Sequence, residues 1–444
     1  MQTPSPNSPM SPTGQTSPKA KRVSLQKIMS TLPVMACFVM GFWFCHLYAG
    51  FECLRSNNTQ EFSLIEEFLP LINSGIRQPQ QQQQQPKNRQ SASSLPPLNL
   101  PEGVDTPRAF AKWTEKYPNR TGLALPCFPS DYPDMLKSAN WRPQRADATR
   151  GLLFNKLMKC GSSTASGIHV RLALKEAKRQ AIDTINGTHC MARWGDHNAA
   201  KNMKYHIRDR QQSMLWTIIR EPTRRWVSHF FFFVVSKNRR LPPTDDNFED
   251  FLNRAGSQYY LKTLETVQED LWNTNPAASI NNIMSDYDFI GIMERMEESA
   301  VAFMMLLNLT IPDILYFDAK SSGTYDDECD LIQPSFVSPR IQEVLKTDHF
   351  QQKVEWDAVL YKAVNRSLDL TIESLGTKEF EWNLHQFQIG QAKIKEICKG
   401  REVFSCSING KRRFFNGKEC LWKDSGCGQS CIQEAIDALG WEDS

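Results

Sequence analysis

Short apolar runs alternate with amphipathic segments through the middle of the chain. The runs predict β-strands at 151–155, 188–194, 214–219 and 287–292. Apolar residues that recur every three or four positions predict helices at 163–179, 198–208, 222–235, 296–307 and 348–375. Strands that alternate with helices are typical of an α/β fold, in which helices flank a parallel sheet.

A longer apolar run, Leu32–Phe51, differs from these because it contains no Lys, Arg, Asp or Glu. At about 1.5 Å per residue, its length matches a bilayer core of about 30 Å. Basic residues cluster between 19 and 27, before the run, and only Arg55 follows it closely. The positive-inside rule then predicts a transmembrane signal anchor, with the N-terminus cytosolic and everything after Phe51 lumenal. A cleaved signal peptide is the alternative, but its charged leader would be unusually long.

Glycosylation and cysteine patterns agree with a lumenal body. N-x-Ser/Thr sequons begin at Asn57, Asn119, Asn186, Asn308 and Asn365, all after the apolar run. The chain has 12 cysteines, and an oxidising lumen would pair most of those that follow the run. Both features predict a secretory-pathway protein.

Composition shifts divide the chain into five parts. Repeated Ser-Pro and Thr-Pro pairs open the chain, and a glutamine run at 80–85 lies among prolines. Neither segment can build a core, so we expect a disordered tail and a solvated stem. The predicted parts are a cytosolic tail at 1–31, the anchor at 32–51, a stem at 52–109, a globular domain at 110–390 and a cysteine-rich extension at 391–444.

The C-terminal extension is predicted to be stapled by disulfides. Its cysteines are Cys398, Cys406, Cys420, Cys427 and Cys431. An odd number requires a partner from elsewhere, for which Cys329 is a candidate. Zinc is the competing interpretation, but Cys427-x-x-x-Cys431 has neither a second matching pair nor a nearby histidine.

The segment 154–164, FNKLMKCGSST, has the residues of an anion-binding turn. It joins a predicted strand to a predicted helix, and Gly161 permits a tight turn between them. Such a turn directs backbone N–H groups and the positive end of a helix dipole toward one spot, which binds phosphate. The expected ligand residues are Lys159, Cys160, Gly161, Ser162, Ser163 and Thr164. A serine that only caps the helix is the alternative, and the Walker pattern is absent.

A second basic site follows the strand at 214–219. Arg220 stands at the carboxyl end of this strand, where open α/β sheets bind ligands. Glu221-Pro222 begins the next helix, on which Ser228 lies. A guanidinium fork and a hydroxyl suit one phosphate, so Arg220 and Ser228 are predicted to share one. A salt-bridged arginine at a strand end is the alternative.

The two segments together resemble the donor-binding motifs of Golgi carbohydrate sulfotransferases. Residues 155–164 are similar to the family's 5′-phosphosulfate loop, R-x-P-K followed by hydroxyl residues, with Met158 in place of the proline. Residues 219–228, IREPTRRWVS, are similar to its 3′-phosphate motif, R-[DE]-P-x-x-R-x-x-S. Residues 287–299 resemble its later G-x-x-E-R block, and 257–261 a glutamine-containing segment. The 2-O-uronosyl and galactose 3-O subgroups are the most similar.

The resemblance implies a fold, a donor and a location. It implies a P-loop-like sheet and the co-substrate 3′-phosphoadenosine 5′-phosphosulfate (PAPS), without a metal. It also implies a type II Golgi membrane enzyme that sulfates a carbohydrate hydroxyl in the lumen. Lys159 would stabilise charge on the leaving oxygen. A tyrosyl peptide is an alternative acceptor, and the chain is compatible with a homo-oligomer.

A hydroxyl acceptor also requires a catalytic base. The family uses His or Glu, and the resemblance leaves three candidates: His189 on the strand at 188–194, His197 just after it, and Glu294. His169 and His206 lie on predicted helices, where we expect them to face solvent.

Charge and composition limit other functions. The net charge of +3 is too small to argue for a nucleic-acid partner. The phenylalanines at 230–233 have helical spacing and are expected in the core rather than as a stacking surface. Lys237, Arg239 and Arg240 would either attract an anionic glycan or form a solvated turn. A nucleotide kinase and a non-catalytic, membrane-anchored glycan-binding protein are the competing functions.

Overall fold

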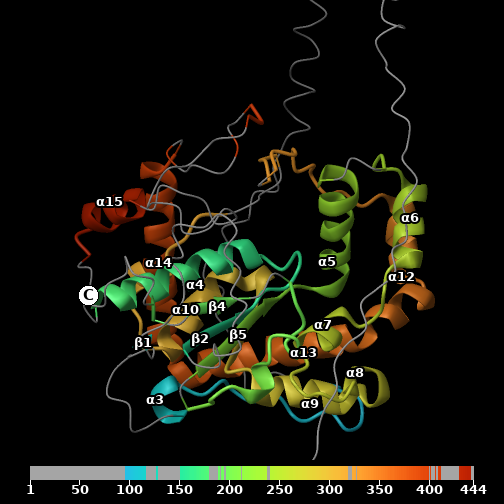
Figure 1. Cartoon of the computed structure of the whole chain (residues 1–444), viewed down its shortest axis with the longest axis horizontal. Coiled ribbons are helices and arrows are strands. Elements are labelled where there is room, and N and C mark those ends of the chain that lie inside the picture. The colour runs from blue at the N-terminus through green and yellow to red at the C-terminus, as the bar shows by residue number, and fades with distance from the viewer. Residues whose placement is uncertain are drawn as a thin grey trace, which may run out of the picture. The chain divides into compact units, whose positions relative to one another are not determined.

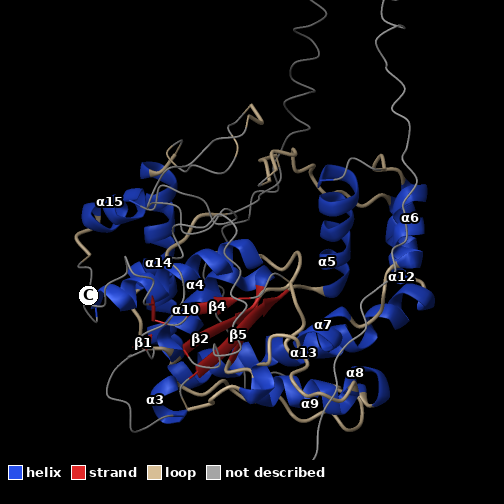
Figure 2. Ribbon diagram, in the orientation of Figure 1, coloured by secondary structure: helices blue, strands red, loops and turns tan. Residues whose placement is uncertain are grey.

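The structure is a computed structural model of one chain, and its helices enclose a small sheet (Figures 1 and 2). It describes residues 96–116, 127–128, 151–179, 189–190, 192–194, 197–211, 213–237, 241–318, 323–326, 328–399, 401, 406, 409–411 and 430–441. Within these ranges, no helix combines the length and apolar character that crossing a bilayer requires. The predicted tail, anchor and most of the predicted stem lie outside them.

Four parallel strands form the central sheet in the order β4-β2-β5-β6. Their bounds are β2 Gly151–Asn155, β4 Ala192–Trp194, β5 Ser213–Ile219 and β6 Phe289–Ile292. All seven β5 residues are buried, as expected for a strand covered on both faces. A separate antiparallel pair joins β1 (Cys127–Phe128) to β3 (His189–Cys190). The predicted strand at 188–194 is therefore two short strands in different sheets.

Helices and short helical turns surround the sheet. Before and between its first strands lie α3 Trp113–Lys116, α4 Ser162–Arg179 and the 3-10 turn η3 Tyr205–Ile207. Between β5 and β6 lie α5 Pro222–His229, η4 Phe230–Lys237, α6 Asp245–Arg254, α7 Tyr259–Leu264, α8 Leu271–Thr274 and α9 Pro276–Asp286. After β6 come η5 Met293–Arg295, α10 Met296–Leu306, α11 Ile311–Ile314, α12 Pro339–Lys346, α13 Asp348–Leu375, α14 Thr377–Ile397 and α15 Ser430–Ala438. Together they confirm an α/β fold.

Aromatic packing joins two helices to one face of the sheet. Phe154 of β2 and Trp216 of β5 are register partners, and their ring centroids lie 4.6 Å apart. Trp216 also packs on Phe303 of α10 at 4.4 Å, and His169 of α4 lies within 6.0 Å of it. Figure 1 shows α4 and α13 on opposite sides of the strands.

Strand order marks the carboxyl ends of β2 and β5 as the expected ligand site. The chain passes from β2 to β4 on one side and then crosses back to β5 on the other. Ligands of open α/β sheets bind at the carboxyl ends of the strands where the order reverses in this way. The register pairs Asn155 with Thr217, and Thr217 Oγ1 donates to the Asn155 carbonyl at 2.7 Å. The segments that follow both strands therefore start side by side.

The prediction of a helix at 198–208 was wrong. The segment makes consecutive turns and only the 3-10 turn η3, and Lys204 has a φ of 58°. Tertiary bonds explain the difference. Ala200 N–H donates to the Thr263 carbonyl at 2.8 Å, and buried Tyr205 donates to the Phe154 carbonyl at 3.2 Å. These tertiary hydrogen bonds override the helical preference of the segment, which has no strong N-terminal cap.

The prediction that His169 faces solvent was also wrong. This side chain is fully buried, and Trp216 Nε1–H donates to its Nδ1 at 3.1 Å. Burial lowers its pKa to about 3, so the ring is neutral. His169 is a core residue that satisfies a buried indole.

Three of the four phenylalanines at 230–233 are buried, as predicted, and Phe233 is half-buried, but the run does not lie on one continuous α-helix. Helix α5 ends at His229, and Phe230–Lys237 continue as a π-helix. Phe230 stacks on Phe248 of α6 with centroids 4.4 Å apart. A π-helical turn rotates the following side chains relative to an α-helix, and such turns frequently accompany functional sites.

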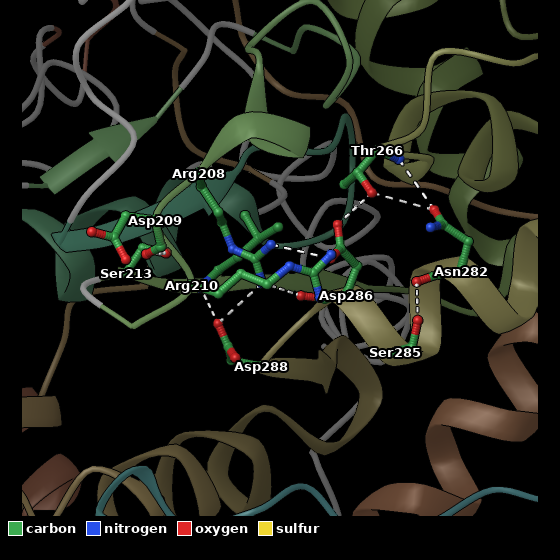
Figure 3. A network of polar contacts seen from close by, with 10 residues as sticks. Arg208, Asp209, Arg210, Ser213, Thr266, Asn282, Ser285, Asp286 and Asp288 are labelled. Carbon is green, nitrogen blue, oxygen red and sulfur yellow. Dashed lines mark hydrogen bonds and ion pairs between the residues drawn. The ribbon is translucent and has the colours of Figure 1, made fainter. Parts of the chain in front are cut away.

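A buried ionic network ties the amino end of β6 to β5 (Figure 3). Arg208 donates to the Asp286 carboxylate at 3.1 Å and lies 3.6 Å from Asp288 Oδ2. Asp288 Oδ2 also accepts the Leu215 N–H at 2.7 Å, and Thr266 donates to Asp286. Asp286 is fully buried, so its charge depends on these partners.

Replacing Asp286 with alanine should lower the free energy of unfolding by about 3 kcal/mol, because it leaves the Arg208 charge buried and incompletely paired. Urea unfolding followed by tryptophan fluorescence measures this loss. Ser285→Ala removes an exposed hydroxyl one residue earlier and should change stability by less than about 0.5 kcal/mol. Equal stabilities of the two variants would contradict a structural role for the network.

Disulfides join the C-terminal part to the domain. Cys329 pairs with Cys406, which confirms the candidate partner from outside the extension. Cys398 at the end of α14 pairs with Cys431 of α15. These sulfurs are therefore not zinc ligands. Cys420 and Cys427 lie outside the described residues.

Candidate active site

The predicted anion-binding turn is a sharply bent loop between β2 and α4, here called the anion loop (residues 156–162). Lys159 has a φ of 62° and Gly161 a φ of 71°. The left-handed region is unfavourable for lysine and is occupied mainly where surrounding structure imposes it, often at functional sites. A Cβ on Gly161 would also approach Met296 Cε to 3.1 Å. The positive φ therefore favours glycine at this position, and the space for a Cβ is tight.

Helix α4 begins at Ser162, the last residue of the anion loop. Its first turn contains no acidic residue, so α4 supplies no carboxylate of its own to neutralise the positive end of the helix dipole. Ser162 and Thr164 are buried and Ser163 is half-buried at this end. The helix start therefore keeps the chemistry of an anion site.

Arg220 follows β5 and meets the anion loop. Its Nη1 donates to the Lys159 carbonyl at 3.4 Å, and its Nε lies 3.7 Å from Glu294 Oε1. Glu294 also accepts the Glu221 N–H at 3.2 Å and the Tyr361 hydroxyl at 3.3 Å. The structure thus brings together the two basic residues that lie 61 positions apart in the chain.

Helix α5 differs from α4 in that an acidic side chain caps its N-terminus. The Glu221 carboxylate accepts the N–H groups of Thr223 at 3.0 Å and Arg224 at 2.7 Å. This side-chain cap already satisfies the helix start. Ser228 lies half-buried in the last turn of α5. Any anion bound by this segment would therefore be held by side chains rather than by the helix start.

The Lys159 ammonium rests on an aromatic ring. Its Nζ lies 3.4 Å from the centroid of the Phe232 ring in the π-helix. A cation over a ring face is attracted to it by about 0.5–2 kcal/mol. Phe232 therefore has a second role besides filling the core, because it fixes where the lysine charge sits.

Burial and nearby charges shift the pKa values of two side chains close to Lys159. The pKa of His229 is lowered to about 3, first by burial and then by the charges of Arg225, Lys159 and His197. Burial raises the pKa of the Cys160 thiol to about 11. That thiol is neutral and contacts the Tyr260 hydroxyl at 3.4 Å. Cys160 is therefore neither an anionic nucleophile nor a charged ligand.

The base candidates lie in different places. His197, with a φ of 53°, lies after β4, and its Nδ1 is 3.0 Å from the Lys156 carbonyl. A carbonyl only accepts, so this contact places a proton on Nδ1 and the basic lone pair of the neutral ring on Nε2. His189 belongs to β3 in the two-stranded sheet, and its side chain lies outside the described part. Glu294 contacts Arg220, as above.

Three aromatic and basic residues at the site were not assigned from the sequence: Arg225, Tyr259 and Tyr260. Arg225 is 1% exposed, and its guanidinium carbon lies 4.0 Å from the ring centroids of both Trp226 and Tyr259. The Arg225 position in the R-E-P-T-R-R motif and the segment 257–261 were visible signals. Sequence spacing alone, however, does not show which atoms of the site these three side chains contact.

Comparison with known protein families gives a match over the same part of the chain. Residues 145–329 match the model of the sulfotransferase family, a segment that contains the anion loop, Arg220 and the segment 257–261. The match confirms the resemblance to sulfotransferases over these residues, at the level of the family. No curated protein matches the chain at a significant level.

Proposed function

We propose that this protein is a Golgi membrane enzyme that transfers a sulfuryl group from PAPS to a hydroxyl of a carbohydrate. The observation that carries the proposal is the meeting of two basic segments at the carboxyl ends of β2 and β5. Arg220 Nη1 lies 3.4 Å from the Lys159 carbonyl oxygen. Lys159 belongs to the anion loop, which leads into α4. A nucleotide with anionic groups at both its 5′ and 3′ positions matches two such adjacent sites.

The residues divide the reaction between them. The anion loop and the start of α4 would hold the 5′-phosphosulfate, and Arg220 and Ser228 the 3′-phosphate. The acceptor oxygen attacks sulfur in line as the bond from sulfur to the nucleotide phosphate oxygen breaks. Adenosine 3′,5′-bisphosphate leaves, and Lys159 stabilises the charge that grows on its oxygen. A base takes the acceptor proton.

The carbohydrate acceptor and the location rest on the sequence. The apolar run at 32–51 and the lumenal sequons favour a type II protein of the secretory pathway. The carbohydrate acceptor follows from the motif resemblance, and a tyrosyl hydroxyl remains the alternative. Sulfate transfer from radiolabelled PAPS to glycosaminoglycan, galactan, N-glycan and tyrosyl peptide acceptors distinguishes them. Transfer to none of the four, with nucleotide binding intact, would favour the glycan-binding alternative.

Nucleotide binding tests the donor site without an acceptor. Arg220→Ala should weaken binding of adenosine 3′,5′-bisphosphate by about 10- to 100-fold, because a charged hydrogen-bond donor contributes about 1.5–3 kcal/mol. Isothermal titration calorimetry on the full chain gives the Kd. Arg254→Ala is the matched control, because Arg254 is exposed and forms its ion pair with Asp250 within its own helix.

Nucleotide binding by the wild-type chain also tests the proposed donor directly. If the wild-type chain binds ATP but not adenosine 3′,5′-bisphosphate, the kinase alternative gains and the proposed donor is wrong. Unchanged affinity in Arg220→Ala would remove Arg220 from the nucleotide site.

A further inference from the structure

Two adjacent tyrosines at the start of α7 contact both halves of the candidate donor site. Tyr259 Oη accepts the backbone N–H of Met158, in the anion loop, at 2.9 Å. Tyr260 Oη accepts the Arg220 N–H at 3.1 Å and donates to the Arg220 carbonyl at 2.5 Å. Neither contact is local, because the tyrosines lie 101 and 40 positions from their partners.

The tyrosine pair is itself held firmly. Asp357 of α13 accepts the Tyr260 N–H at 2.9 Å, which anchors the first turn of α7 to a long helix. Gln258, in the left-handed conformation with a φ of 51°, donates to the Gln352 carbonyl and accepts the Asp357 N–H. The Arg225 guanidinium packs on the Tyr259 ring at 4.0 Å. Rigid support on several sides gives these hydroxyls fixed positions.

The hydroxyls remain neutral donors and acceptors. Burial raises the pKa of Tyr259 to about 12 and that of Tyr260 well above its usual value. Met158 is half-buried, so its N–H is only partly accessible to water. An unmade hydrogen bond at such a group is costly. The bond from Met158 to Tyr259 therefore restrains the backbone one residue before Lys159.

We propose that Tyr259 is a positioning residue that fixes the anion loop for donor binding, an inference that rests on the proposed function. Its hydroxyl supplies through a hydrogen bond the restraint that a proline at position 158 would supply covalently. A proline has a fixed φ and no N–H to satisfy. The hydroxyl of Tyr259 should therefore be necessary with methionine at position 158 and dispensable with proline there.

A double-mutant cycle tests this dependence. The full-length wild type, Tyr259→Phe, Met158→Pro and the double variant are titrated with adenosine 3′,5′-bisphosphate. Tyr259→Phe should weaken binding by about tenfold, from the loss of one hydrogen bond to a partly buried group. In the Met158→Pro background, the same change should alter the Kd by less than about twofold. Rescue by proline is not expected if Tyr259 has only a general structural role.

Tyr205→Phe is the matched control. It also removes a buried tyrosine hydroxyl that donates to the β2 backbone, at Phe154 rather than in the anion loop. It should leave the Kd nearly unchanged, and Met158→Pro should not affect that result. Hydrogen exchange in the anion loop is a second measurement, which decides the question if Met158→Pro fails to fold. The loop should exchange faster in Tyr259→Phe than in wild type and Tyr205→Phe.

The outcomes separate the two proposals. Wild-type binding with an unaffected Tyr259→Phe variant, or a Tyr259→Phe defect that proline does not rescue, would overturn the positioning role and leave the proposed function intact. A wild-type chain that does not bind the bisphosphate would overturn the proposed function, and with it this inference.

Discussion

Lys159→Ala is expected to lower kcat for sulfate transfer by about 100- to 1,000-fold, the usual loss when one preorganised group is removed from a developing negative charge. The left-handed backbone at Lys159 and the Phe232 ring 3.4 Å from its ammonium both hold the charge in one place. Stabilisation that grows toward the transition state appears in kcat more than in donor binding. Radiolabelled transfer from PAPS to the acceptor found in the screen measures kcat.

A matched lysine variant controls for lost surface charge. Lys262 also lies over an aromatic ring, Trp272, at 5.4 Å, but it is exposed on α7. Lys262→Ala should keep kcat within about twofold, as surface substitutions generally do. A Lys159→Ala variant with normal kcat and weakened PAPS affinity would show that Lys159 only binds the donor.

His197→Ala is expected to lower kcat by about 100- to 10,000-fold while leaving the Kd of adenosine 3′,5′-bisphosphate unchanged, because a general base acts on the acceptor rather than the nucleotide. His197 is favoured because its Nδ1 contact with the Lys156 carbonyl directs the basic lone pair to Nε2. The same assay on His189→Ala and Glu294→Gln compares the three candidates directly.

The pH profile gives an independent check. Wild-type activity should fall at acidic pH, where a histidine base becomes protonated, and this fall should be absent from the residual activity of His197→Ala. The buried residues His169 and His229 cannot produce it, because their pKa values are lowered to about 3. His206→Ala is the control, since His206 contacts Gln268 away from the anion loop. A full loss of activity in His189→Ala, with His197→Ala active, would assign the base to His189.

Much of the fold could be predicted from local pattern. The helix at 348–375 was predicted with its observed bounds from its long apolar periodicity, and the structure adds a Thr347 side-chain cap at its start. Strands β5 and β6 were predicted within two residues of their starts, since buried parallel strands are continuous apolar runs. The segment 198–208 failed, because tertiary bonds to β2 and α7 decided its conformation.

The sequence by itself determined the chemistry of the two basic segments, because a glycine turn, a lysine and an arginine at a strand end are local features. Only the tertiary structure decided that these segments meet. Strand order puts the ends of β2 and β5 next to each other, and the Tyr259–Tyr260 pair joins them through hydrogen bonds spanning 101 and 40 positions. Such contacts depend on how whole elements pack, so no local pattern along the chain encodes them.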